Sequence, residues 1–102
     1  MVHYILLKLK KDADVTLLYF HCRKVYADLE WELPFLHDAE VSRCATARDS
    51  NADIMIRMHI DAPEQLNDFF RHPKHLDWIE EVKDYVSDWM SFDWPEDAKD
   101  AC

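Results

Sequence analysis

Residues 69–78 read FFRHPKHLDW, and this stretch places a corner between two helices. Pro73 cannot sit inside a helix, because it lacks an N–H donor and its ring clashes with the preceding turn. Proline does suit a first helical turn. We therefore predict one helix over 63–71 and a second over 73–84. His75 then lies in the first turn of the second helix, where the helix dipole disfavours an imidazolium and keeps the ring neutral and basic at pH 7.

The chain on either side of this corner shows the alternation of β-strands. The pattern is clearest at 53–61, where every second residue is apolar. Alternation also predicts strands at 2–10, 39–48 and 85–94, and apolar residues at helical spacing predict a helix at 15–32. The chain contains no glycine, so turns that need a positive φ must use Asn or Asp, and residues 49–53 are the expected place.

The order of these elements defines the fold class. The series β-α-β-β-α-α-β is the split βαβ pattern of ferredoxin-like α+β domains. Right-handed crossovers give a four-stranded antiparallel sheet with its helices on one face. The other face, which carries Tyr4, Leu6, Met55 and Arg57, would be bare in a monomer. We therefore expect two copies to pair through this open sheet face as a homodimer, forming a dimeric α+β barrel.

Composition narrows the partners and the compartment. The formal charge of −9 argues against nucleic acid and anionic membrane surfaces, which need clustered Lys and Arg. The three cysteines are widely spaced without a CxxC pair, so we expect a reducing, cytoplasmic location. The absence of glycine excludes P-loop and Rossmann sites. We expect one domain at 1–94 and an acidic tail at 95–102.

Four segments resemble a known family. They are VHYILLKLKKDAD (2–14), ADIMIRMHIDAPEQLNDFF (52–70), HPKHLDW (72–78) and SFDW (91–94). Together they are similar to the stress-responsive A/B barrel (Dabb) domain of the dimeric α+β barrel superfamily, over about residues 2–94. The HPxH block is the most specific piece. The resemblance implies a homodimer with a pocket in each protomer, between the helices and the concave face of the sheet.

The resemblance also implies roles for individual residues. Relatives such as the plant olivetolic acid cyclase close a linear tetraketide thioester without a metal or organic cofactor. Their base, the second histidine of the HPxH block, is matched by His75, and a histidine near the start of the first strand is matched by His3. A tyrosine that assists the base stands six residues earlier in those enzymes, where this chain has Phe69.

The residues themselves suggest the same candidates. His75 is the candidate base and His3 the candidate assistant, while a structural role or simple ligand contact for His75 stays open. His72 is expected mainly to cap the end of the preceding helix. No metal site is expected, because Pro73 separates the two block histidines and no second His/Cys pair completes a ligand set. The remaining expected pocket residues, which are also core candidates, are Ile5, Leu7, Phe20, Ile56, Met58, Phe69, Phe70, His72, Trp78 and Trp89.

Two classes of function fit these observations. The first is a homodimer that binds a small apolar or aromatic molecule. Any chemistry would be cofactor-free, cyclase-like or isomerase-like, with His75 removing a proton next to a carbonyl. The alternative is a non-catalytic, stress-associated or assembly dimer whose histidines only pack. A cavity of about 300 Å³ or more reached by the His75 ring would favour the first class.

Overall fold

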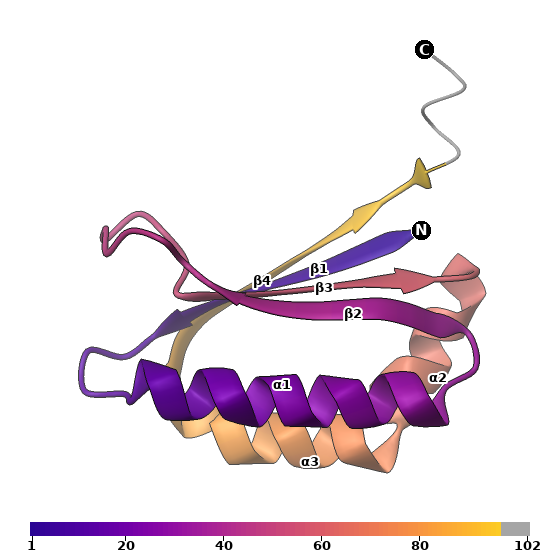
Figure 1. Cartoon of the computed structure of the whole chain (residues 1–102), viewed down its shortest axis with the longest axis horizontal. Helices are drawn as coiled ribbons and strands as arrows, with labels where there is room; N and C mark the ends of the chain where they lie inside the picture. The colour runs from indigo at the N-terminus through magenta and orange to yellow at the C-terminus, as the bar shows by residue number, and fades with distance from the viewer. Residues whose placement is uncertain (97–102) are drawn as a thin grey trace.

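The computed structural model describes residues 1–96, which form a sheet covered on one face by helices (Figure 1). The described part contains four strands, three α-helices and two short 3₁₀ turns, at Pro63–Gln65 and Lys83–Tyr85. The strands and helices are β1 (Val2–Leu9), α1 (Val15–Glu32), β2 (Leu36–Arg43), β3 (Ile54–Ile60), α2 (Leu66–Arg71), α3 (Pro73–Val82) and β4 (Val86–Trp94). The expected tail at 95–102 lies mostly outside the described residues.

The sheet has the order β2-β3-β1-β4, and all of its neighbouring strands are antiparallel. This is the ferredoxin-like arrangement, so the predicted fold class is confirmed. In the register of β1 with β3, His3 lies opposite Met58 and Ile5 opposite Ile56, as expected. None of the helices in the described part is long and apolar enough to cross a membrane.

Local sequence explains where the helices begin. The Asp14 carboxylate accepts a hydrogen bond from the Leu17 amide at 3.1 Å and caps α1. Pro73 occupies the first turn of α3, where its missing N–H costs nothing. The predicted helix at 63–71 is divided into a 3₁₀ turn and α2, and α3 ends two residues earlier than predicted.

The second strand differs most from its prediction. It was expected at 39–48, but β2 starts at Leu36, which pairs with Ile60, and it ends at Arg43. A register shift after His37 accompanies a φ of 53° at Asp38, the one described residue with positive φ. The left-handed residue is therefore an aspartate, as the lack of glycine requires, but it does not lie in the expected 49–53 turn.

The two faces of the sheet are unlike each other. The helix-facing side holds the hydrophobic core, in which Leu7, Ile56 and Met58 are almost fully buried. The other side is uncovered. On β4 it carries three large, exposed apolar side chains, which are Met90 (66% exposed), Phe92 (56%) and Trp94 (53%). The register of β4 with β1 places these three opposite Leu6, Tyr4 and Val2.

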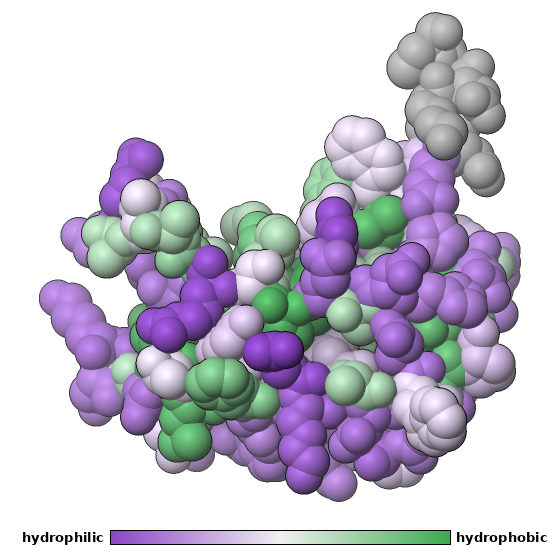
Figure 2. All heavy atoms as spheres, viewed as in Figure 1, coloured by the Kyte–Doolittle hydropathy of each residue, from purple (hydrophilic) through white to green (hydrophobic). Residues whose placement is uncertain are grey.

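Two segments flank this uncovered side. The end of β4 rises beside it at upper right in Figure 1, and the loop 44–53 rises at upper left. Figure 2 shows apolar atoms along the upper edge between these two segments. We call this side the open face, defined by Val2, Tyr4, Leu6, Met55, Arg57, Met90, Phe92 and Trp94. Arg57 forms an ion pair at 3.0 Å with Glu40 of the same chain.

Candidate functional site

An open hollow of about 350 Å³ lies between the helices and the β4 side of the sheet. Helices α2 and α3 provide one wall, and strands β1 and β4 provide the other. The hollow is mostly apolar, but two imidazole rings reach it. Its lining residues are His3, Ile5, Phe70, His75, Trp78, Ile79, Trp89, Met90 and Ser91.

His75 is the first polar group of this hollow. It is the third residue of α3 and is only 5% exposed. Its Nδ1 lies 3.2 Å from the carbonyl oxygen of Phe70. A carbonyl can only accept, so Nδ1 carries the hydrogen and Nε2 carries the lone pair in the neutral ring. No hydrogen-bond partner for Nε2 exists among residues 1–96.

The protonation of His75 follows from its surroundings. Burial lowers the pKa of His75 below its usual value of 6.5, and the neighbouring rings of His3 and His72 lower it further. The hydrogen bond to Phe70 opposes this shift but is the smaller effect. The sequence also predicted a neutral ring, but it attributed this to the helix dipole. In the structure, burial is the main cause of the lowered pKa of His75. Neutral His75 therefore offers a basic nitrogen at pH 7.

His3 is the second polar group of the hollow. It is 2% exposed on β1, and the register places it directly opposite Asp93 of β4. Its Nδ1 lies 2.5 Å from a carboxylate oxygen of Asp93. The carboxylate accepts from Nδ1–H, so the remaining nitrogen, Nε2, is again without a partner in the described part of the chain. Asp93 thus fixes the orientation of the His3 ring.

Two phenyl rings bring the imidazoles together. The Phe69 ring centre lies 4.5 Å from that of His75 and 5.9 Å from that of His3. The corresponding distances for Phe70 are 5.7 and 5.9 Å. Trp78 continues this wall at 5.8 Å from His75 and contacts the ring of Trp89 edge-on. The site is therefore an aromatic wall with two imidazole side chains that line the same hollow.

The expected pocket residues separate into three groups. Ile5, Phe70, Trp78 and Trp89 line the hollow with the two histidines. Four others are buried core residues that do not line it, namely Leu7, Ile56, Met58 and Phe69. The last two, Phe20 and His72, lie elsewhere.

Phe20 is not a core residue, contrary to the prediction. Its side chain is 57% exposed, and its ring packs edge-on against the Tyr19 ring, with 5.2 Å between the two ring centres. The reason is helical geometry, because Phe20 follows the buried Leu18 by two positions and so points away from the core.

His72 also acts differently from the prediction. Its backbone N–H bonds to the Phe69 carbonyl and closes α2, but its ring caps the next helix. The ring Nδ1 accepts from the Lys74 amide at 3.1 Å, which satisfies a free donor at the start of α3. The ring therefore stabilises the α2–α3 corner rather than the end of the preceding helix.

Four further residues belong to the site but were missed, namely Ile79, Met90, Ser91 and Asp93. Only the β1–β4 register reveals Asp93 as the partner of His3, and the sequence does not give that register. Among residues 1–96, no group of three His, Cys, Asp or Glu side chains is arranged to hold a metal ion.

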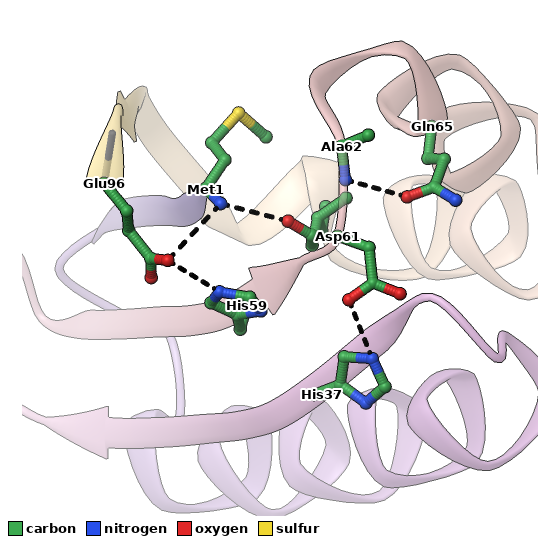
Figure 3. Close-up of polar contacts among 8 residues, drawn as sticks. Met1, His37, His59, Asp61, Ala62, Gln65 and Glu96 are labelled. Atoms are coloured by element: carbon green, nitrogen blue, oxygen red, sulfur yellow. Dashed lines mark hydrogen bonds and ion pairs between the residues drawn. The ribbon is translucent and has the colours of Figure 1, made fainter. Parts of the chain in front are cut away.

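Two other histidines lie on the open-face side of the sheet, away from the hollow. Figure 3 shows that His37 contacts Asp61 and that His59 contacts Glu96, at 3.0 and 2.9 Å. The Met1 ammonium lies 3.8 Å from Glu96. His37 and His59 are therefore useful internal controls, because they are engaged with carboxylates outside the candidate site.

Comparison with known proteins places the chain in a family. The model of the stress-responsive A/B barrel domain matches residues 1–96. The chain belongs to this family. The match covers the whole described part, including both histidines of the hollow. No curated protein matches this Dabb-domain chain.

Solved structures share the fold at low sequence identity. A dimeric protein of unknown function with a ferredoxin-like fold from Bacteroides fragilis has a TM-score of 0.78 at 14% identity, covering 91% of this chain and 92% of that one. A dimeric ferredoxin-like protein of unknown function from Thermobifida fusca has a TM-score of 0.74 at 13% identity, and the match covers 89% of this chain and 85% of that one. The hydroxynitrile lyase of Passiflora edulis has a TM-score of 0.74 at 11% identity, and the match covers 91% of this chain and 89% of that one.

Proposed function

We propose that this Dabb-domain protein is a cytoplasmic homodimer that binds a small apolar or aromatic carbonyl compound in the hollow and moves a proton on it without a cofactor. One observation carries the proposal. His75 and His3 line the same hollow of about 350 Å³, and in each ring the Nδ1 atom is engaged while Nε2 has no partner within residues 1–96. Binding sites with this composition, apolar with a few placed polar groups, suit small organic ligands.

The two rings have unequal surroundings, which suits them to opposite tasks. His75 has no carboxylate partner and a lowered pKa, so its neutral Nε2 can take a proton from a C–H next to a carbonyl. His3 has the Asp93 carboxylate on Nδ1, which holds the ring in place beside the ligand. When Nε2 carries a hydrogen, it can donate to the carbonyl oxygen as negative charge develops there.

The homodimer part of the proposal rests on the open face. Met90, Phe92 and Trp94 leave a contiguous apolar surface beside β1, and surfaces of this kind mark interaction sites. A second copy covers it best, because the same patch on both subunits is self-complementary about a two-fold axis. The B. fragilis and T. fusca neighbours, which share the fold, are described as dimers, and this supports the proposal.

The P. edulis neighbour bears on the chemistry only in general terms. Its name describes a hydroxynitrile lyase, so the same fold is found in an enzyme. At 11% identity the likeness extends to the fold, and the proposed reaction rests on His75, His3 and Asp93 of this chain.

Proton exchange gives a direct test. An aryl methyl ketone, 4-hydroxyacetophenone, is incubated with the protein in D₂O, and loss of its methyl protons is followed by NMR. The His75→Asn variant keeps a donor near the Phe70 carbonyl but lacks Nε2, so exchange should slow by about 10²–10⁴-fold. The matched control is His37→Asn, which removes a histidine outside the hollow and should leave exchange unchanged.

The alternative, a non-catalytic dimer, has one observation in its favour. Phe69 and Trp78 are fully buried and fill the space behind the histidines. In that case neither exchange nor ligand-induced stabilisation would be found with aryl ketones, thioesters or phenols, although the dimer would form. Such a result would refute the proposed site and leave the assembly function.

A further inference from the structure

Met90 belongs to two surfaces of the molecule at once. The register with β1 places it opposite Leu6, on the open face, and it is 66% exposed in the single chain. It also lines the histidine hollow, beside Trp89, whose ring contacts Trp78. Both are possible because β4 is an edge strand, the last in the order β2-β3-β1-β4. The Met90 side chain therefore lies at the border between the open face and the histidine hollow.

A second hollow, of about 410 Å³, lies on the open-face side of this border. It shares Trp89 and Met90 with the histidine hollow, so the two concave surfaces meet at the edge of β4. Within residues 1–96, no strand pairs with the outer side of β4. The second hollow is lined by Leu6 and Lys8 of β1, by residues 49–52 and by residues 88–90 of β4.

The methionine side chain suits a wall that becomes fixed only in an assembly. It is unbranched and has three rotatable bonds, so it adapts to the surfaces that contact it. Met90 is also the most exposed of the three large apolar side chains on the open side of β4. The opposite wall of the histidine hollow differs, because Phe70, His75 and Trp78 stand on α2 and α3. The β4 side is therefore the least constrained part of the hollow.

The area that a dimer needs brings the partner to this border. Phe92 and Trp94 are 56% and 53% exposed. An aromatic side chain buries about 150–250 Å² when it is fully covered, so together these two offer about 160–270 Å². A stable interface buries about 800 Å² on each partner. The interface must therefore extend well beyond the two rings, and Met90 is the next residue of β4 on this face.

We propose that a second copy of the chain completes the histidine hollow by closing its rim over Met90, so that ligand binding and dimerisation strengthen each other. This coupling rests on the proposed function, because it concerns the same ligand and the same homodimer. With the partner in place, Met90 is held between two surfaces and water is excluded from the β4 side of the hollow. Excluding water strengthens the hydrogen bonds inside a site. Coupling is reciprocal, so the ligand stabilises the dimer by the same free energy.

Calorimetric titration with 4-hydroxyacetophenone compares the dimer with a monomer. The monomer is Phe92→Lys, which changes the open face at a residue that does not line the histidine hollow. It should bind the ketone at least about fivefold more weakly than the wild type, the lower end of common coupling energies. Saturating ketone should lower the dissociation constant of the wild-type dimer at least about 25-fold, because each of two sites contributes its fivefold coupling. Phe20→Lys, exposed on the helical side, is the matched control and should change neither quantity.

The possible outcomes are distinct. Equal affinity in monomer and dimer means that each protomer holds a complete hollow, which overturns the coupling and leaves the proposed function standing. A Phe92→Lys chain that stays dimeric also overturns the coupling, because the partner then lies elsewhere. A wild-type dimer that does not bind the ketone refutes the proposed function, and the coupling with it. Should Phe92→Lys fail to fold, the wild type diluted below the dissociation constant of its dimer supplies the monomer, and the same criteria apply.

Discussion

Phe92→Lys should dissociate the proposed dimer. Phe92 lies on the edge strand β4, between Met90 and Trp94 of the open face, and is 56% exposed in the single chain. A Phe side chain buries about 200 Å² when covered, so about 110 Å² is available to a partner. At about 25 cal/mol per Å², full coverage contributes nearly 3 kcal/mol per subunit. If half of that area is covered, two subunits together lose about 3 kcal/mol, which weakens dimerisation about 100-fold. Burying a lysine adds to this loss.

The assay is light scattering coupled to size-exclusion chromatography over a dilution series. The wild-type chain should have twice its monomer mass of 12.2 kDa, and Phe92→Lys should approach the monomer mass at concentrations where the wild type stays dimeric. Phe20→Lys is the matched control, since Phe20 is 57% exposed but lies on α1, on the helical side. If Phe20→Lys dissociates the protein and Phe92→Lys does not, the open face is not the dimer interface.

Three further changes test the fold and the site. Trp78→Ala removes a fully buried ring and its hydrogen bond to the Cys22 sulfur at 3.3 Å. It should lower the free energy of unfolding, measured with urea, by about 3–5 kcal/mol. A decrease of less than about 1 kcal/mol would contradict the close packing of this ring. Asp14→Ala removes the carboxylate that caps α1 by accepting from the Leu17 amide. It should lower the free energy of unfolding by about 1 kcal/mol, which corresponds to a decrease in Tm of about 4–8 °C. Because burial lowers the pKa of His75 below its usual 6.5, its stabilising contribution is complete above pH 6.5 and falls as pH drops below that value. The wild type should therefore lose more stability than His75→Asn between about pH 7 and pH 5, and parallel losses would contradict the shift.

Much of the fold could be read from local sequence. The alternation of Ile54, Ile56, Met58 and Ile60 predicts β3, because one face of that strand is buried throughout. Helix α1 has the predicted bounds, since the Asp14 cap begins it and its buried stripe repeats at helical spacing. These features depend on residues close together in the chain.

The features that were missed depend on contacts between distant residues. The Asp38 bulge that shifts β2 is set by pairing with β3, and Asp38 has no glycine beside it to mark it. Asp93 becomes part of the site only through the register of β4 with β1. Phe20 was misplaced for another reason, since its aromatic character was weighed above its position on the helix.

NMR of the imidazole nitrogens in ¹⁵N-labelled protein, during titration with 4-hydroxyacetophenone, tests whether His75 and His3, which line one hollow, contact the same ligand through Nε2. We expect the Nε2 signals of these two rings to shift together and saturate at one ligand concentration, while those of His37 and His59 stay in place. A ligand that binds without moving both Nε2 signals, or no binding by any aryl ketone, would contradict this expectation.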